Sequence, residues 1–165
     1  MTVGTTLFDK LISAASSSQA LGWMQDHGYT RLVMQYGKGV EPPIPQDGSS
    51  RNIEIVTYRF RPTLDEDMKD ADLILSHAGA GTVHEATKLG KQLVVVINRE
   101  LMNNHQTELA HAMGSRRHLF VVNSPEDLES LDVWTEFHNF VPVPYVGGDD
   151  FDFPCVIDAL MGFSG

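Results

Sequence analysis

Short apolar segments alternate with amphipathic ones along most of this chain. Six segments have the composition and length of strands: residues 1–3, 31–35, 53–58, 73–77, 93–97 and 119–122. The last three are dominated by Leu, Ile and Val, which is typical of parallel strands buried on both faces. The pattern therefore predicts a Rossmann-like α/β fold, a mainly parallel sheet with helices on both faces, formed by residues 1–165 as a single domain.

Helix signals fill the intervals between these strands. We expect helices from about residue 8, over residues 20–25 and 65–69, from Thr82 to Gly90, from Asn103 or Asn104 to Gly114, and after Ser124. Ser124 followed by Pro125 is a typical helix start, and Pro154 begins a final apolar helix at residues 154–161. Residues 134–150 are rich in aromatic residues, proline and glycine, and residues 125–150 as a whole are poorly assigned.

Composition narrows the classes of partner. The net charge of −10 and a pI near 5.0 exclude a sequence-independent nucleic-acid binder, which needs many Lys and Arg side chains. The single cysteine, Cys155, allows no internal disulfide and favours a reducing compartment. The longest apolar stretch, residues 93–97, is too short to span a membrane, and no basic leader precedes an apolar block. We therefore expect a soluble, cytoplasmic protein.

Ligands of a parallel α/β sheet bind outside the carboxyl ends of its strands. That rule selects three segments of this chain, each of which follows a predicted strand: residues 4–6, 76–85 and 98–106. The first contains Gly4, Thr5 and Thr6, whose backbone N–H groups suit a sugar or phosphate, although a plain turn is an equal interpretation.

The second segment, SHAGAGTVHE at residues 76–85, is the most informative stretch of the chain. Gly79 and Gly81 allow a ligand to approach the backbone, and a helix start offers free N–H groups to a diphosphate. Glu85, one turn into the helix, is placed to accept hydrogen bonds from a ribose diol. Thr82 and Glu85 also match a capping box, a structural role compatible with ribose binding. The dinucleotide fingerprint G-x-G-x-x-G is a rival interpretation, but His84 occupies the position of its third glycine.

The third segment groups Asn104, His105 and Gln106 at a predicted helix start. Their donors and acceptors suit sugar hydroxyls and an acetamido group. The structural alternative is that Asn103 caps the helix and Gln106 completes the cap.

Other polar groups favour structural roles. Asp65 and Asp67 form a D-x-D pattern, which we place on the solvated face of a short helix rather than on a metal ion. The histidines have no metal-site spacing, so no metal or other cofactor is expected. Arg59 and Arg61 are expected to solvate a loop rather than to bind phosphate.

Three motifs in this order carry a family resemblance. They are SHAGAGT-x-x-E, LGK-x-LVVV-x-N and LMNNHQ-x-ELA, preceded by the opening TVGTT at residues 2–6. Together they resemble the UDP-GlcNAc-binding subunit of the dolichol-linked N-acetylglucosaminyltransferase, which acts early in asparagine-linked glycosylation. That family is similar to the C-terminal half of the bacterial glycosyltransferase that makes lipid II, which has a GT-B fold. Its first strand normally has more apolar residues before TVGTT, which leaves the sheet edge undecided here.

The resemblance implies a single GT-B-type donor-binding domain that holds UDP-GlcNAc without metal. Glu85 would lie near the ribose, and Asn104, His105 and Gln106 near the sugar. Residues 4–6 would close over the donor. The diphosphate would face the second segment, whose remaining candidate residues are Ser76, His77, Gly79, Ala80, Gly81 and Thr82.

The resemblance further implies a heterodimer. A membrane-anchored partner would bind the lipid-linked acceptor and recruit the chain to the cytosolic face of the endoplasmic reticulum. We expect the helix at residues 154–161 to be the docking surface for this partner. The reaction would be attack of an acceptor hydroxyl on the anomeric carbon, with inversion and loss of UDP. His77 is the one local candidate for the general base, and the partner is the alternative source. The alternative function is a non-enzymatic nucleotide-sugar or NAD-binding regulatory subunit.

Overall fold

The computed structural model describes residues 1–43, 52–99 and 104–145, with the side chains of residues 104 and 105 left out. Cys155 and the predicted helix at residues 154–161 lie outside this part of the chain. The elements, in chain order, are α1 (Asp9–Ala15), α2 (Ser18–Asp26), β1 (Arg31–Gln35), β2 (Glu54–Tyr58), α3 (Asp65–Asp70), β3 (Leu73–His77), α4 (Ala80–Lys88), β4 (Gln92–Val96), α5 (Asn104–Ser115), β5 (Phe120–Val122), a 3-10 helix η1 (Pro125–Glu129) and α6 (Leu131–His138).

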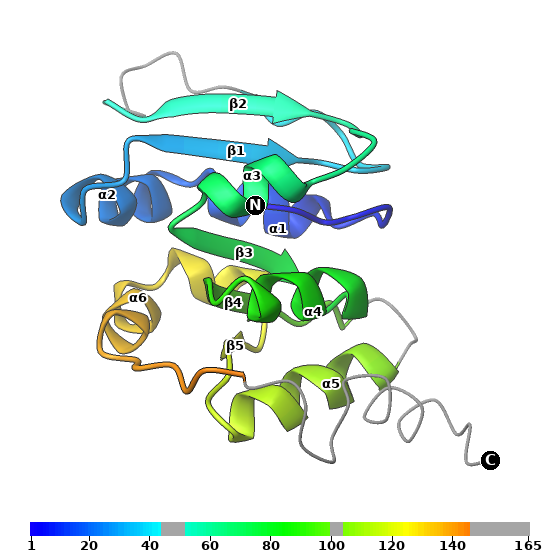
Figure 1. Cartoon of the computed structure of the whole chain (residues 1–165). Coiled ribbons are helices and arrows are strands. Elements are labelled where there is room, and N and C mark those ends of the chain that lie inside the picture. The colour runs from blue at the N-terminus through cyan, green and yellow to red at the C-terminus, as the bar shows by residue number, and fades with distance from the viewer. Residues whose placement is uncertain (44–51, 100–103, 146–165) are drawn as a thin grey trace.

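The strands are parallel. β1 pairs with β2, and β4 lies between β3 and β5. The amino-terminal segment joins these two groups, because Thr2 bridges Gln35 of β1 and Ser76 of β3, and the amino end lies between β1 and β3 in Figure 1. The predicted first strand is therefore central, and it belongs to no sheet edge.

Counting this segment as the first strand gives the spatial order β2, β1, Thr2 segment, β3, β4, β5. In chain numbering this is 3-2-1-4-5-6, the order of the doubly wound dinucleotide-binding fold. The predicted Rossmann-like α/β class is confirmed.

Helices cover both faces of the sheet, as predicted. Side chains alternate along a strand, so Val94 and Val96 of β4 point to one face while Leu93 and Val95 point to the other. The first face packs against α1, α2, η1 and α6, and the second against α3, α4 and α5. In Figure 1, α3, α4 and α5 lie in front of the sheet.

Helix α6 occupies part of the segment that the sequence left unassigned. Ser130 caps its start, and Trp134 and Phe137 are buried on one side of it. The Trp134 ring stacks on Trp23 at 4.6 Å, and its Nε1 donates to the Leu128 carbonyl oxygen at 2.7 Å. Trp134 and Phe137 thus belong to the core. In the described ranges, no helix is both long and apolar enough to cross a membrane.

Candidate functional site

The strand order reverses between the Thr2 segment and β3, and ligands of doubly wound sheets bind at this switch point, outside the carboxyl ends of the strands. The loops that follow these two strands are residues 4–6 and residues 78–79. The structure therefore brings together two of the three segments that the sequence selected.

A single side chain separates the two loops. A Cβ atom on Gly79 would lie 2.6 Å from Nε2 of His77, and one on Gly4 would lie 3.1 Å from Cε1 of the same ring. Gly4 also has a φ of +57°, a conformation that favours glycine. Both loops therefore approach the His77 ring with bare backbone.

A third loop, which the sequence analysis did not select, supports residues 4–6 from the other side. A Cβ on Gly37 would lie 2.7 Å from the Thr6 carbonyl oxygen and 2.8 Å from that of Gly4, and Gly37 has a φ of +59°. The N–H of Lys38 donates to the Thr6 carbonyl oxygen at 3.2 Å. Gly37 follows β1, so the carboxyl-end rule applied to every strand would have found it.

Local hydrogen bonds shape residues 4–6. The hydroxyl of Thr2 accepts from the Gly4 N–H at 3.0 Å and donates to the Gln35 side chain. The Thr6 hydroxyl and N–H both donate to the Val3 carbonyl oxygen, at 2.7 and 3.1 Å. Thr5, in the middle of this loop, is exposed.

Helix α4 begins earlier than the sequence predicts. Gly79 is its N-cap in an extended conformation, and no side chain caps the helix. The predicted capping box of Thr82 and Glu85 is therefore wrong, because Thr82 already lies within the first turn. The N–H groups of Ala80, Gly81 and Thr82 have no intrahelical acceptor, since helix bonding starts with Val83 N–H to the Gly79 carbonyl oxygen at 3.0 Å. The predicted end of this helix is confirmed, because α4 ends at Lys88 and Gly90 follows it with a φ of +66°.

Glu85 does not cap the helix, and its side chain contacts another carboxyl group, that of Asp65. A hydrogen bond with the side chain of Asp65 raises the pKa of Glu85, and partial burial and the charge of Asp65 act in the same direction. Asp65 begins α3, so the contact joins two helices on the same face of the sheet. This neighbour of Glu85 was not foreseen from the sequence.

Two buried residues at the end of β3 have structural contacts. Ser76 is fully buried, and its hydroxyl donates to the His77 carbonyl oxygen at 2.8 Å. His77 is 5% exposed, and burial lowers the pKa of its imidazole, partly offset by a hydrogen bond with the Thr2 backbone. Its Nδ1 is buried without a hydrogen-bond partner. The ring is therefore neutral at physiological pH and offers no open surface to an acceptor hydroxyl.

The third predicted segment is described in part. Asn104 begins α5, and Asn104 and His105 have no described side chains. Gln106 lies in the first turn and is partly buried. Residues 100–103 are outside the described ranges, so the alternative of a cap by Asn103 is not tested.

The D-x-D residues and the arginines make contacts within the protein. Asp67 accepts from the Tyr58 hydroxyl at 2.5 Å and from Arg61 at 2.8 and 2.9 Å, while Arg61 also lies over the Tyr58 ring. Arg59 lies over Tyr36 and donates to the Gly37 carbonyl oxygen at 3.3 Å. In the part of the chain that is described, no group of three or more His, Cys, Asp or Glu side chains is arranged to hold a metal ion.

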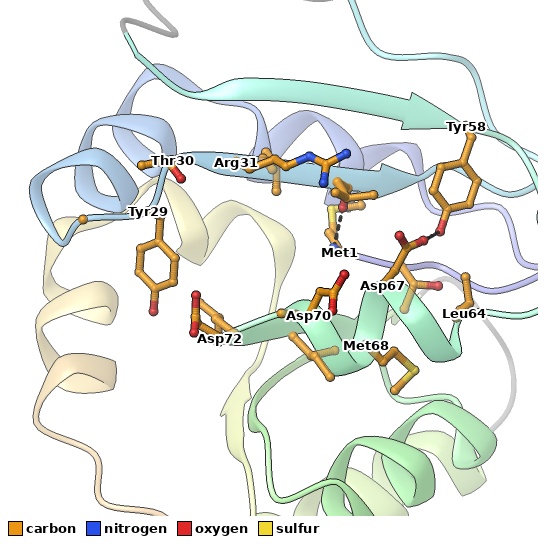
Figure 2. A pocket seen from close by; sticks show the side chains of 17 residues that line it. Met1, Tyr29, Thr30, Arg31, Tyr58, Leu64, Asp67, Met68, Asp70 and Asp72 are labelled. Atoms are coloured by element: carbon orange, nitrogen blue, oxygen red, sulfur yellow. Dashed lines mark hydrogen bonds between the residues drawn. The ribbon is translucent and has the colours of Figure 1, made fainter.

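A cavity of about 280 Å³ lies at the opposite end of the sheet (Figure 2). It is bounded by the start of β1, the start of β3 and the helix α3, and Met1 and Thr2 form its inner wall. Asp67, Asp70 and Asp72 line it, and the Met1 amine donates to the Val33 carbonyl oxygen at 2.6 Å. None of the predicted site residues lines this cavity.

The chain resembles proteins of one family. Residues 1–131 match the model of the glycosyltransferase family 28 C-terminal domain. The chain is 47% identical over 120 residues to the UDP-N-acetylglucosamine transferase subunit ALG13 of Homo sapiens, which covers 73% of this chain and 10% of the human protein. The subunit of the same name from Yarrowia lipolytica is 34% identical over 120 residues, covering 73% of this chain and 61% of that protein. The chain thus spans about a tenth of the human relative.

Solved structures share the fold. The NMR solution structure of ALG13 superposes with a TM-score of 0.67 at 20% identity, covering 96% of this chain and 92% of that one. The crystal structure of MurG from Acinetobacter baumannii gives a TM-score of 0.55 at 19% identity, covering 97% of this chain and 44% of that one. With most of its length matched by the family model, this chain belongs to the glycosyltransferase family 28 C-terminal domain family.

Proposed function

We propose that this chain is the donor-binding subunit of a two-subunit glycosyltransferase that transfers GlcNAc from UDP-GlcNAc to a GlcNAc-diphosphate-dolichol acceptor. The observation that carries the proposal is the convergence of residues 4–6 and residues 79–82 at the switch point of the sheet. Membership of the glycosyltransferase family and the names of the relatives supply the chemistry.

The diphosphate of the donor binds at the start of α4. The N–H groups of Ala80, Gly81 and Thr82 and the positive end of the helix dipole meet the phosphate oxygens, and no side chain competes as a cap. Gly81 is exposed, and a Cβ on it would have no neighbour within 4 Å, so the backbone has room for a ligand. When UDP leaves, the same N–H groups stabilise the charge that develops on the β-phosphate.

The rest of the donor extends from this point. Glu85 accepts hydrogen bonds from the ribose diol, and Gln106, with Asn104 and His105 on the same helix, binds the sugar. Residues 4–6 cover the donor through backbone N–H groups and the exposed Thr5. The binding groups are all supplied by the protein, so no metal is required.

The acceptor and the general base come from a membrane-anchored partner that forms a heterodimer with this chain at the cytosolic face of the endoplasmic reticulum. His77 is too enclosed to take a proton from an acceptor hydroxyl, which supports a base on the partner. The acceptor hydroxyl attacks the anomeric carbon, its proton passes to that base, and UDP leaves with inversion.

A transfer assay tests the whole proposal. The purified chain, alone and co-expressed with the membrane partner, is supplied with UDP-GlcNAc and a lipid-diphosphate-GlcNAc acceptor. We expect transfer by the pair and little or none by the chain alone. Failure of the pair to transfer, with intact assembly, would contradict the proposal.

A binding screen separates the alternative function. The chain is titrated with UDP-GlcNAc, UDP and NAD. The pair Gly79 and Gly81 follows β3, which is the fourth strand in chain order when the Thr2 segment is counted as the first. Dinucleotide-binding sites have this glycine motif after the first strand. We therefore expect UDP-GlcNAc to bind and NAD not to bind. Gln106→Ala should weaken UDP-GlcNAc binding and leave UDP binding nearly unchanged; equal losses would assign Gln106 to the helix alone.

A further inference from the structure

The imidazole of His77 lies between the two loops that the proposed function assigns to the donor site. Its Cε1 and Nε2 edge faces Gly79 on one side, where a Cβ would lie 2.6–2.7 Å away, and Gly4 on the other, where the distance would be 3.1 Å. Real Cβ atoms essentially never approach within 3.0 Å, so the ring and the Gly79 backbone are in full contact.

Both loops are also fixed to the strand that carries this ring. The Gly79 N–H donates to the His77 carbonyl oxygen at 2.8 Å, which makes the chain turn sharply at the end of β3. On the other side, Thr2 bridges Ser76, and its N–H donates to the Leu75 carbonyl oxygen at 2.9 Å. Each loop is therefore anchored where it leaves its strand, and the ring lies between the two loops.

The ring is not placed to bind phosphate as a cation or to exchange protons with solvent. It is 5% exposed, its Nδ1 is enclosed, and burial keeps its pKa low, so it neither reaches solvent nor carries a charge for phosphate at neutral pH.

We propose that His77 is a positioning residue whose imidazole sets the separation between residues 4–6 and residues 79–82, and thereby the width of the diphosphate site. This inference rests on the proposed function, because it takes the space between these loops to be the donor site. It assigns the His77 ring a steric role and makes Gly4 and Gly79 its matched partners. A smaller side chain would let the loops close together, and a side chain on Gly79 would push them apart.

The first experiment compares two substitutions of the ring. His77→Phe keeps a planar ring and cannot transfer a proton, whereas His77→Ala removes the ring. Titration with UDP and UDP-GlcNAc should show at least about a tenfold loss of affinity for both ligands in His77→Ala, and less than about a threefold loss in His77→Phe. His138→Ala, an exposed histidine at the end of α6, is the matched control and should bind like the unchanged chain.

The second experiment is a double-mutant cycle with Gly79→Ala. The added methyl should lower both the thermal midpoint and donor affinity while the ring is present, and should cost much less in the His77→Ala background, because the clash is then absent. Additive effects of the two substitutions would overturn the proposal. The thermal midpoints decide this even if the unchanged chain binds no UDP-GlcNAc, an outcome that would refute the proposed function instead.

Activity of the assembled pair excludes the catalytic alternative. A positioning role predicts that His77→Phe keeps most of kcat and leaves its pH profile unchanged. If His77 were the general base, His77→Phe and His77→Ala would lose about a hundredfold or more in kcat alike, with donor affinity intact. That pattern would also overturn the proposal.

Discussion

The two ends of the sheet differ in how they are filled. At the carboxyl end, three loops meet through glycine backbone, with prospective Cβ atoms 2.6–3.1 Å from neighbouring atoms. At the amino end, β1 and β3 are separated by a cavity of about 280 Å³ lined by three aspartates. Of the candidate site residues, Gly4, Thr6, His77 and Gly79 lie at this crowded end. A site that binds phosphate with backbone N–H groups needs close backbone packing, so the proposed donor site would not be found by the size of a cavity.

The cavity is lined by residues other than those of the three loops. Met1 and Thr2 line it between β1 and β3, together with residues of α3 and of the starts of β1 and β3. We therefore expect substitutions at the carboxyl end to lower both donor affinity and stability, and substitutions at the amino end to lower stability alone.

The largest difference is expected from glycines in the same conformation at opposite ends. Gly37 has a φ of +59° and faces two carbonyl oxygens, whereas Gly28 has a φ of +84° and no neighbour within 4 Å of a Cβ. Gly37→Ala should cost about 3–4 kcal/mol of unfolding free energy and at least about tenfold in donor affinity, because a methyl would displace residues 4–6. Gly28→Ala, which borders the cavity, should cost about 1 kcal/mol and leave donor affinity unchanged. Denaturant unfolding measures the stability of the two variants, and UDP titration measures their donor affinity. Equal losses of UDP affinity would contradict the expected difference between the two ends of the sheet.

The next effect belongs to the amino end. Burial lowers the pKa of the Met1 amine to about 6 from an ordinary value of 8.0, opposed by the charge of Asp67. Between these values the unfolded chain binds more protons than the folded one, so the unfolding free energy should rise by about 2–3 kcal/mol from pH 6 to pH 8 and level off above. Acetylation of the amine should remove most of this dependence. The burial of His77, whose pKa is also lowered, acts in the same direction at lower pH and survives acetylation. A stability profile that acetylation does not change would show that the amine is solvated.

The sequence predicted which loops lie at the carboxyl end of the sheet, but not the contacts that these loops make. The strand pattern and the carboxyl-end rule selected Gly4 and Gly79, because that inference needs only local pattern and a topological rule, but they did not show that the two strands are neighbours. The capping box of Thr82 and Glu85 was wrong, since local spacing matched but Gly79 starts the helix instead. Contacts between distant segments, such as Gly37 against Thr6, arise from packing that no local pattern encodes.

The same limit explains α6. Ser130, Trp134 and Phe137 have the spacing of a capped amphipathic helix, but the aromatic and proline residues that follow masked the pattern. Trp134 is held by its stacking on Trp23 and by its bond to Leu128, which belong to tertiary structure. Helical periodicity applied from residue 131 would have found the helix.

Glu85→Gln should separate ligand binding from stability at the carboxyl end. If Glu85 binds the ribose diol, loss of its charge should weaken UDP binding by about 1–3 kcal/mol. The unfolding free energy should barely change, because Glu85 caps no helix and its neighbour is another carboxyl group. Titration calorimetry and thermal unfolding of the same variant measure the two quantities. Unchanged UDP affinity would contradict a ribose role, and a large loss of stability would show that Glu85 supports the fold.

The smallest expected effect is a change in the pH dependence of donor binding. The hydrogen bond with Asp65, then burial and the Asp65 charge, raise the pKa of Glu85, so Glu85 takes up a proton at a higher pH than an ordinary glutamate as the solution is acidified. If the ionised carboxylate binds the ribose, donor affinity should fall with the same proton uptake. Asp65→Asn removes the like charge and lets an amide N–H donate to Glu85, which favours the ionised form. Titrations of UDP between pH 4 and 7 should then show the fall in affinity at lower pH than in the unchanged chain.

The matched control is Asp70→Asn, which changes an exposed aspartate of the same helix that borders the amino-end cavity. It should not change the pH at which UDP affinity falls. Equal shifts for both variants would mean that the net charge of α3 acts at long range, and no shift for Asp65→Asn would mean that Glu85 binds the donor independently of its neighbour.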